Sequence, residues 1–154
     1  MPSREPNRIA VVTDSTAMLT TDVLDAREIS VVPLQVVVGS RSYDELADGD
    51  AEMVADALRA RRPVSTSRPA PQAFLALYEK LARDGAEAVV SVHLSGEISG
   101  TCESARLAAR QSPIPVEVVD SRLVGLGTGF AVLAASDALT AGASAAAAAA
   151  AARR

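Results

Sequence analysis

The sequence predicts an α/β fold, a parallel sheet flanked by helices of the Rossmann-like kind. Short runs rich in β-branched residues alternate along the chain with stretches whose apolar residues recur at helical spacing. The connections between these segments are short, and parallel strands need a crossover helix between them. With 154 residues, of which 49% are hydrophobic, the chain is long enough to bury one core of this kind.

The first half of the chain contains two β-branched runs and two helical patterns. A polar cluster at 13–16 follows the first run and can cap a helix. Pro33 interrupts the second run, which suggests an edge strand or a bulge. The predicted elements, in order, are a strand at 9–12, a helix at 17–27, a strand at 29–38, a turn at 39–42 and a helix at 50–60.

Prolines and glycines divide the second half of the chain. Pro63 and Pro69 bound an extended polar loop, because each disfavours the α region for the residue before it. Asp120 and Ser121 are placed to cap a glycine-containing helix that breaks at Gly142. The predicted elements, in order, are a loop at 63–69, a helix at 71–83, a strand at 87–93, a helix that ends before 113, a strand at 116–119, a helix that ends near 140 and an alanine-rich helix.

The loops that follow the strands are rich in hydroxyl groups and glycines. In a parallel sheet such loops share the carboxyl edge, so those at 13–16, 94–101 and 120–121 should line one crevice. A helix N-terminus approached over glycine can hold a carboxylate or a phosphate with its unpaired N–H groups. The alternative is that each cluster only caps a helix. The candidate ligand-binding residues are Thr13, Asp14, Ser15, Thr66, Ser67, Ser95, Gly96, Ser99, Gly100 and Thr101.

Composition and charge argue against several classes of function. Only 3% of the residues are aromatic, the net charge is −4 and the arginines are scattered, so we expect no nucleic-acid binding. One cysteine and one histidine exclude a disulfide scaffold and a Cys/His zinc site, and we expect no metal. The glycines at 125–129 resemble a dinucleotide loop, but Phe130 stands where the third glycine belongs, so we expect no cofactor.

The sequence contains no evident targeting or membrane segment. The start, at 1–8, is charged and holds no apolar run of signal-peptide type. The longest apolar run, the terminal alanines, is too short to cross a bilayer. We therefore expect a cytoplasmic protein that does not span a membrane.

A catalytic alternative involves the single histidine. His93 lies two residues before Ser95, so the two would share a face if the strand continued, which suggests a serine nucleophile with a histidine base. The sequence has no G-x-S-x-G elbow, and a histidine inside a strand is more often a hydrogen-bonded core residue. A small serine hydrolase using Ser95 or Ser99 with His93 remains one alternative, and an interaction fragment without a ligand is another.

Five motifs occur in an order that resembles the DegV family of bacterial lipid-binding proteins. They are Val12-Thr13-Asp14-Ser15-Thr16, Val32-Pro33-Leu34 with Tyr43-Asp44, Thr66-Ser67-Arg68-Pro69, Leu94-Ser95-Gly96-Glu97-Ile98-Ser99-Gly100-Thr101 before Ser104-Ala105, and Val119-Asp120-Ser121. One such motif is weak, but five at matching spacing are specific. The resemblance covers nearly the whole chain and implies the first, Rossmann-like domain of a DegV protein.

The resemblance also implies a function without catalysis by the chain itself. Members of the family bind one long-chain fatty acid, present its carboxylate to a separate fatty acid kinase subunit and carry the acyl phosphate onward into phospholipid metabolism. The residues that match the family's carboxylate contacts are Thr66 and the serines of the 94–101 motif. Two departures are visible here: Gly96 replaces the second serine of that motif, and Arg68 stands where glutamine is usual.

This chain is shorter than the members of the family that it resembles. Family members are nearly twice as long, and their second domain covers the acyl chain. We therefore expect residues 1–142 to form the lipid-binding α/β domain and 143–154 to form an alanine-rich helical tail that begins a second domain, as in a truncated form. A site with one wall keeps head-group contacts but loses tail burial, so we expect weak fatty acid binding and an exposed apolar surface.

Overall fold

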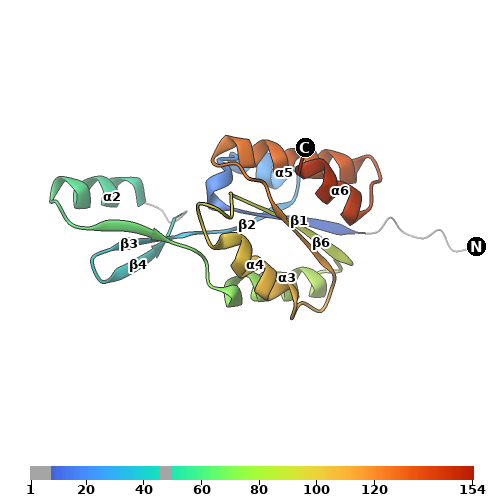
Figure 1. Ribbon diagram of the computed structural model, residues 1–154, viewed down its shortest axis with the longest axis horizontal. Coiled ribbons are helices and arrows are strands. Elements are labelled where there is room, and N and C mark those ends of the chain that lie inside the picture. The colour runs from blue at the N-terminus through green and yellow to red at the C-terminus, as the bar shows by residue number, and fades with distance from the viewer. Residues whose placement is uncertain (1–7, 46–49) are drawn as a thin grey trace, which may run out of the picture.

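The computed structural model describes residues 8–45 and 50–154 and contains a four-stranded parallel sheet flanked by helices (Figure 1). The strands are, in spatial order, β2 (Ile29–Val32), β1 (Ile9–Asp14), β6 (Ala88–His93) and β7 (Val116–Asp120). All neighbouring pairs are parallel, and Val11 of β1 lies opposite both Ile29 and Val90. The predicted α/β fold class is confirmed.

Helices cover both faces of this sheet. Helices α1 (Thr21–Ala26), α5 (Leu126–Thr140) and α6 (Ala145–Ala152) cover one face, and α3 (Pro71–Arg83) and α4 (Thr101–Ala109) cover the other (Figure 1). Because side chains alternate along a strand, Val11 faces the first layer of helices and Val12 the second. The core of the first face consists largely of valine and alanine, whereas Phe74 and Tyr78 fill the second.

A second, smaller sheet projects from the carboxyl ends of the parallel strands. It consists of β4 (Arg41–Asp44), β3 (Gln35–Val38) and β5 (Val64–Ser67) in that spatial order, with antiparallel pairing, and α2 (Asp50–Arg59) packs on one face (Figure 1). We call this unit, residues 35–45 and 50–68, the arm, and the remainder the body. Its buried hydrophobic core is small and consists of Val36, Val38 and Ala57.

Three sequence predictions are wrong in the arm. The run at 29–38 is not one strand, because it divides at Pro33 into β2 of the parallel sheet and β3 of the arm. Proline cannot donate to a ladder, and the chain changes sheets at that residue. The segment 63–69 is not a loop, since residues 64–67 pair with β3 as β5. The predicted turn at 39–42 is confined to 39–40, because β4 begins at Arg41.

The helix predicted at 17–27 is also shorter than expected. A 3₁₀ turn at Ser15–Ala17 precedes it, and α1 begins only at Thr21. Met18 ends the turn in the left-handed region, with φ of 56°, so the chain cannot continue directly into an α-helix. The remaining predicted helices, at α2, α3, α4 and α6, agree with the structure to within a few residues.

The alanine-rich segment after Gly142 packs on the body. Ala148, Ala149 and Ala152 of α6 are buried in the same core as Val90. The domain boundary at 142 stays a prediction. Among the described residues, no helix combines the length and the apolar character that a bilayer span requires. The charged start at 1–7, on which the expectation about targeting depends, lies outside the described residues.

Candidate functional site

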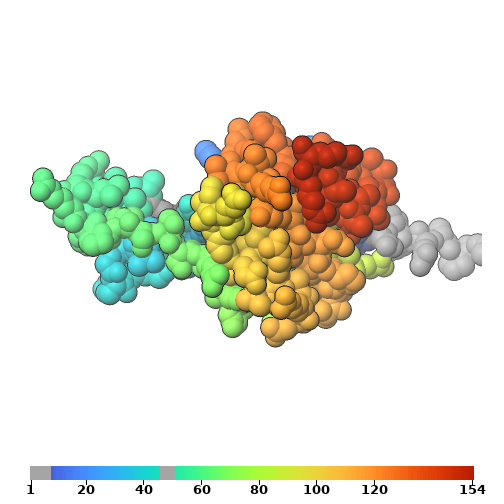
Figure 2. Space-filling view, viewed as in Figure 1, coloured from blue at the N-terminus to red at the C-terminus, as the bar shows by residue number. Residues whose placement is uncertain are grey.

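Three loops meet at the carboxyl edge of the parallel sheet. The N–H of Leu94, at the end of β6, donates over 3.1 Å to the carboxylate of Asp14 at the end of β1. The N–H of Gly96 donates over 3.1 Å to the carboxylate of Asp120 at the end of β7. Figure 2 shows the loops after β6 and β7 side by side on the surface, beside the arm. The structure thus brings the three predicted junctions together.

The loop between β6 and α4 uses many of its polar groups locally. Ser95 Oγ accepts a hydrogen bond from the N–H of Glu97 over 3.3 Å. Ser99 Oγ accepts one from the N–H of Thr101 over 3.3 Å and lies 2.8 Å from Thr101 Oγ1. A hydroxyl has one donor and two acceptor sites, so Ser95 keeps an O–H to donate. The N–H of Thr101 already donates to Ser99 Oγ, whereas the N–H groups of the next first-turn residues of α4 have no acceptor inside the helix and are able to bind an anion.

The two glycines of this loop stand where other atoms come close. A Cβ on Gly96 would lie 2.7 Å from Asp120 Oδ2, so the serine usual at this position does not fit without movement of Asp120. A Cβ on Gly100 would lie 2.6 Å from Cδ of Arg68 and would also contact its guanidinium. The first contact gives a physical reason for the departure at Gly96, and the second shows how closely Arg68 approaches the start of α4.

The arm contributes Thr66, Ser67 and Arg68 to this region. Thr66 and Ser67 are exposed on β5, opposite Val36 and Gln35 of β3. Two residues of an extended strand span roughly 7 Å, so Thr66 lies about that far from Arg68, whose side chain covers Gly100. The arm therefore approaches the start of α4 through Arg68.

Asp14 is fully buried, and its carboxylate joins two of the loops. Oδ2 accepts from the N–H of Leu94 over 3.1 Å and from His93 Nδ1 over 3.0 Å, while Oδ1 accepts from the N–H of Thr16 over 3.0 Å. Burial raises the pKa of Asp14, but the hydrogen bonds from His93, Thr16 and Leu94 outweigh it and hold that pKa below its usual value of 3.8. The carboxylate is thus engaged inside the protein.

Both ring nitrogens of His93 are engaged as well. Nδ1 lies 3.0 Å from Asp14 Oδ2, and Nε2 lies 2.7 Å from Ser91 Oγ. Within the described residues, neither Ser95 nor Ser99 forms a hydrogen bond to His93. His93 therefore pairs with neither of the two serines that the hydrolase alternative names. Its surroundings are those of a hydrogen-bonded core histidine.

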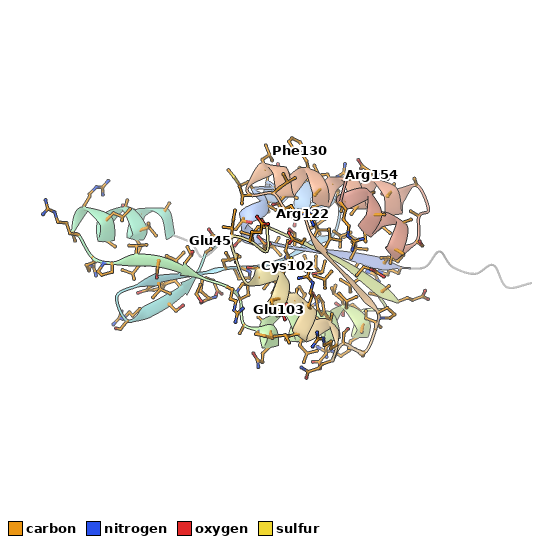
Figure 3. All side chains as sticks on the ribbon, in the orientation of Figure 1. Glu45, Cys102, Glu103, Arg122, Phe130 and Arg154 are labelled. Carbon is orange, nitrogen blue, oxygen red and sulfur yellow. The ribbon has the colours of Figure 1, made fainter. Side chains whose placement is uncertain are left out.

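Thr13 is fully buried, and Ser15 is half-buried. Ser15 Oγ donates to the carboxylate of Glu45 and accepts from the N–H of Leu34 over 2.9 Å, which links the body to the arm. Glu45, labelled in Figure 3, lies at that junction. Thr13 Oγ1 is buried with no hydrogen-bond partner among the described residues, and its side chain lines a cavity of about 30 Å³ beside Met18. A cavity of that size holds a water molecule.

Asp120 and Ser121 do not cap a helix, contrary to the sequence prediction. Helix α5 begins at Leu126, because Gly125 before it adopts φ of 57° and turns the chain. Asp120 Oδ1 instead accepts from the N–H groups of Gly96 and Arg122, over 3.1 and 2.9 Å. Asp120 therefore orders the loop after β7, while Ser121 Oγ accepts from the N–H of Leu123 over 3.2 Å and lies 3.2 Å from Thr128 Oγ1 of α5.

Exposed apolar side chains are concentrated in the loops at this edge of the sheet and at the start of α5. Of eight large hydrophobic residues that are exposed in the described chain, six come from the loops after β1, β6 and β7 or from the start of α5. They are Met18, Ile98, Leu123, Val124, Leu126 and Phe130. Phe130, which Figure 3 labels on α5, is 63% exposed. We call these six residues the apolar rim, and their exposure agrees with the apolar surface that we expect.

A larger open cavity, of about 980 Å³, lies at the opposite edge of the sheet. It is lined by residues near the start of β1 and the ends of α1, α3 and α5, among them Arg8, Arg27 and Thr140. Neither this cavity nor the one beside Thr13 is lined by Thr66 or Ser95. The candidate site thus coincides with neither of these two cavities.

Sequence reasoning missed several residues of this region. Ser91 and Tyr78, which continue the hydrogen bonds from His93, were not candidates, although Ser91 lies two residues before His93 and so shares its side of the strand. Glu45, the partner of Ser15, has no local signal in the sequence.

Cys102 is buried at the start of α4, and burial raises its pKa to about 12, which makes it an unreactive thiol.

Comparison with known proteins identifies the family. The family model described as "Uncharacterised protein, DegV family" matches residues 8–154. The chain belongs to the DegV family. Among curated relatives of this DegV chain, the DegV domain-containing protein SCO2569 of Streptomyces coelicolor is 45% identical over 134 residues, which are 87% of this chain and 48% of the relative. A DegV domain-containing protein of Deinococcus radiodurans is 41% identical over 137 residues, which are 88% of this chain and 48% of the relative.

Solved structures of DegV proteins share the fold. The Thermus thermophilus structure, described as "Fatty Acid Binding of a DegV family Protein", superposes with a TM-score of 0.86 at 36% identity, over 96% of this chain and 52% of that one. The Bacillus subtilis structure, described as "DegV, a fatty acid binding protein", gives a TM-score of 0.81 at 35% identity, over 88% of this chain and 48% of that one. The chain thus spans about half the length of the relatives that it matches.

Proposed function

We propose that this chain binds the carboxylate end of a long-chain fatty acid at the carboxyl edge of its parallel sheet and carries the lipid without catalysing a reaction. The observation on which the proposal depends is the meeting of two surfaces at that edge. Ser95, Ser99 and Thr101 bring hydroxyl groups to the start of α4, and the six residues of the apolar rim come from the loops at the same edge and from the start of α5. A lipid with an acidic end needs both.

The head-group contacts that we propose come from both parts of the molecule. Thr66 and Ser67 come from the arm, and the loop 95–101 and the start of α4 come from the body. The O–H of Ser95 and the first-turn N–H groups of α4 are neutral donors, and the helix N-terminus adds a partial positive charge. Arg68 adds a full charge beside Gly100. We assign Thr13, Asp14 and Ser15 a supporting role, since Asp14 and Ser15 bond within the protein and Thr13 and Asp14 are fully buried.

The acyl chain in this proposal lies along the apolar rim. Each CH₂ that leaves water contributes about 0.8 kcal/mol. An open surface covers only one side of the chain, so affinity for the isolated 154-residue chain is weak. The printed descriptions of the Thermus thermophilus and Bacillus subtilis structures, at 36% and 35% identity, support the choice of a fatty acid.

We also propose a partner and a setting for this carrier. A fatty acid kinase subunit would phosphorylate the presented carboxylate, and the acyl phosphate would continue into phospholipid metabolism in a bacterial cytoplasm. The exposed loop residues Gly96, Glu97 and Ile98 before α4 support presentation, because a partner can reach a head group held there. Nucleotide and metal would belong to the kinase.

A nuclear magnetic resonance titration tests the proposed function. Uniformly ¹⁵N-labelled chain is titrated with decanoate and, as a control without charge, with methyl decanoate. We expect amide shifts at Ser95, Gly96 and Thr101 that saturate with decanoate and are absent at the same amides with the ester. Equal shifts with both compounds would show that the carboxylate is not recognised. No shift with either would favour the interaction fragment without a ligand.

Variants locate the proposed contacts. Ser95→Ala and Thr66→Val each remove one hydroxyl, and each should weaken decanoate binding by roughly fivefold, which corresponds to one hydrogen bond. Ser136→Ala is the matched control, because Ser136 is buried, hydrogen-bonded to Arg27 and located near the opposite edge of the sheet. Binding by Ser95→Ala that equals binding by Ser136→Ala would contradict the assignment of Ser95.

A further inference from the structure

Four buried side chains form a continuous chain of hydrogen bonds beneath the candidate site. Tyr78 Oη of α3 lies 2.8 Å from Ser91 Oγ, which lies 2.7 Å from His93 Nε2. His93 Nδ1 lies 3.0 Å from Asp14 Oδ2. All four residues are fully buried, and the ring of Phe74 packs edge-on against His93 at a centroid distance of 5.0 Å. The chain connects helix α3, through β6, to the end of β1.

The donors in this chain can point in one consistent direction. The Asp14 carboxylate has a lowered pKa and only accepts, so His93 Nδ1 carries a proton and donates to it. In a neutral ring, Nε2 then accepts from the Ser91 hydroxyl. Ser91 accepts in turn from Tyr78, whose pKa burial raises, so that its hydroxyl stays protonated. In this arrangement each of the four side chains has its partner.

This series of hydrogen bonds ends at the Asp14 carboxylate, which joins two loops of the site. Asp14 Oδ2 accepts both from His93 and from the N–H of Leu94, the residue before Ser95. Asp14 Oδ1 holds the N–H of Thr16 in the loop after β1. A carboxylate without a fixed orientation could rotate and release either loop. The orientation of Asp14 therefore affects where Ser95 and the start of α4 lie.

We infer that Tyr78, Ser91 and His93 are positioning residues, which orient the Asp14 carboxylate and through it the loop that carries Ser95. The inference rests on the proposed function for its consequence, since Ser95 is a proposed head-group contact. None of the three side chains touches the ligand. They hold the buried carboxylate in one orientation. The loop is then already ordered when the head group binds, and no free energy is spent on ordering it.

Because the protein has a single histidine, the direction of the hydrogen bonds in this series of side chains can be measured directly. In ¹⁵N-labelled protein all histidine ring signals come from His93, because the chain has one histidine. We expect the tautomer with the proton on Nδ1. A ring protonated on Nε2 only would overturn the inference, because Asp14 could then not accept from it. This measurement needs no ligand and so is independent of the proposed function.

Two variants test whether the chain positions the loop. Ser91→Ala removes the central hydroxyl, and Tyr78→Phe removes the terminal one while keeping the aromatic ring that fills the core. We expect both to shift the Leu94 amide signal and to weaken decanoate binding, Ser91→Ala by about fivefold. Ser136→Ala, the same chemical change near the other edge of the sheet, should change neither.

The outcomes separate this inference from the proposed function. If the wild-type chain does not respond to decanoate, the proposed function fails and the inferred role in binding fails with it. If the wild type responds, but Ser91→Ala and Tyr78→Phe both bind as Ser136→Ala does, only the positioning role is overturned. A shifted Leu94 amide with weakened binding in Ser91→Ala or Tyr78→Phe, and not in Ser136→Ala, supports the inference.

Discussion

The body and the arm differ in how each of them is stabilised. In the body, helices cover both faces of four parallel strands, and Phe74 and Tyr78 are completely buried. In the arm, one helix packs on three short antiparallel strands, and the buried hydrophobic core is three residues, none larger than valine. A core of that size contributes little stability by itself. The body is therefore the folding unit, and the arm depends on its connections to the body.

This difference has a consequence for the proposed site. Ser95 and the start of α4 stand on the body, whereas Thr66 stands on the arm. Contacts that join the two parts include Ser15 with Glu45, the N–H of Glu45 with the carbonyl of Leu34 over 2.8 Å, and Arg68 with Gly100. Head-group binding would then require that the less stable part be held correctly against the more stable one.

The largest effect that we predict is on the stability of the body. Phe74→Ala removes a fully buried ring that contacts both Tyr78 and His93, and it should lower the free energy of unfolding by about 3–5 kcal/mol. Urea denaturation followed by circular dichroism measures the change. A loss below about 1 kcal/mol would contradict the location of the core on this face.

Protonation of Asp14 should affect the body next most strongly. Because its folded pKa lies below the usual 3.8, the stability that its ionised form contributes is fully present above that pH and is lost as the pH falls through the folded pKa. Urea midpoints measured from pH 7 downward should therefore fall below about pH 4 in the wild type. Asp14→Asn should be less stable at neutral pH by about 2 kcal/mol and should lose less on acidification. Parallel pH profiles for the two proteins would contradict this account.

A matching change in the arm should have a smaller and more local effect. Val36→Ala removes two methyl groups from the core that α2 and the arm strands share, and should cost about 1–2 kcal/mol. Hydrogen exchange should show faster exchange of the β3 and β5 amides while the amides of β6 stay protected. Equal acceleration in both sheets would show that arm and body unfold as one unit.

The smallest effect that we predict is at the junction. Ser15→Ala removes the hydroxyl that bonds both Glu45 and the N–H of Leu34, and it should cost about 1 kcal/mol or less in stability. Its effect should appear in decanoate affinity rather than in the unfolding transition, because the arm is less well held. Unchanged affinity in Ser15→Ala would show that this contact does not position Thr66.

The same difference explains what the sequence could predict. Long helices with one buried and one exposed face can be predicted from the spacing of their apolar residues alone. Helix α3, which buries Phe74 and Tyr78, is an example. The arm strands are four residues long and polar on one face, and their pairing partners lie far away in the sequence. In the sequence alone, β5 therefore looks like a loop, because its strand character depends on pairing with β3. Pro33 marked an interruption, but only the structure shows that the chain changes sheets there.

For the site, the sequence located the edge but not the network. The meeting of the loops after β1, β6 and β7 follows from the parallel topology, which the alternation of strands and helices predicts. The hydrogen bonds of His93 to Ser91 and Asp14 do not follow, because they depend on which strands are neighbours and on side-chain directions. The link between Ser15 and Glu45 depends on the turn of the arm and has no local signal.

The most direct test of the central claim, that arm and body hold one carboxylate together, is a double-mutant cycle on decanoate affinity. Thr66→Val, Ser95→Ala and the double variant are titrated under the same conditions as the wild type. If both hydroxyls hold the same head group, the losses should not add: the double variant should bind less than about twofold more weakly than either single variant. Fully additive losses, or no loss in Thr66→Val, would contradict the claim.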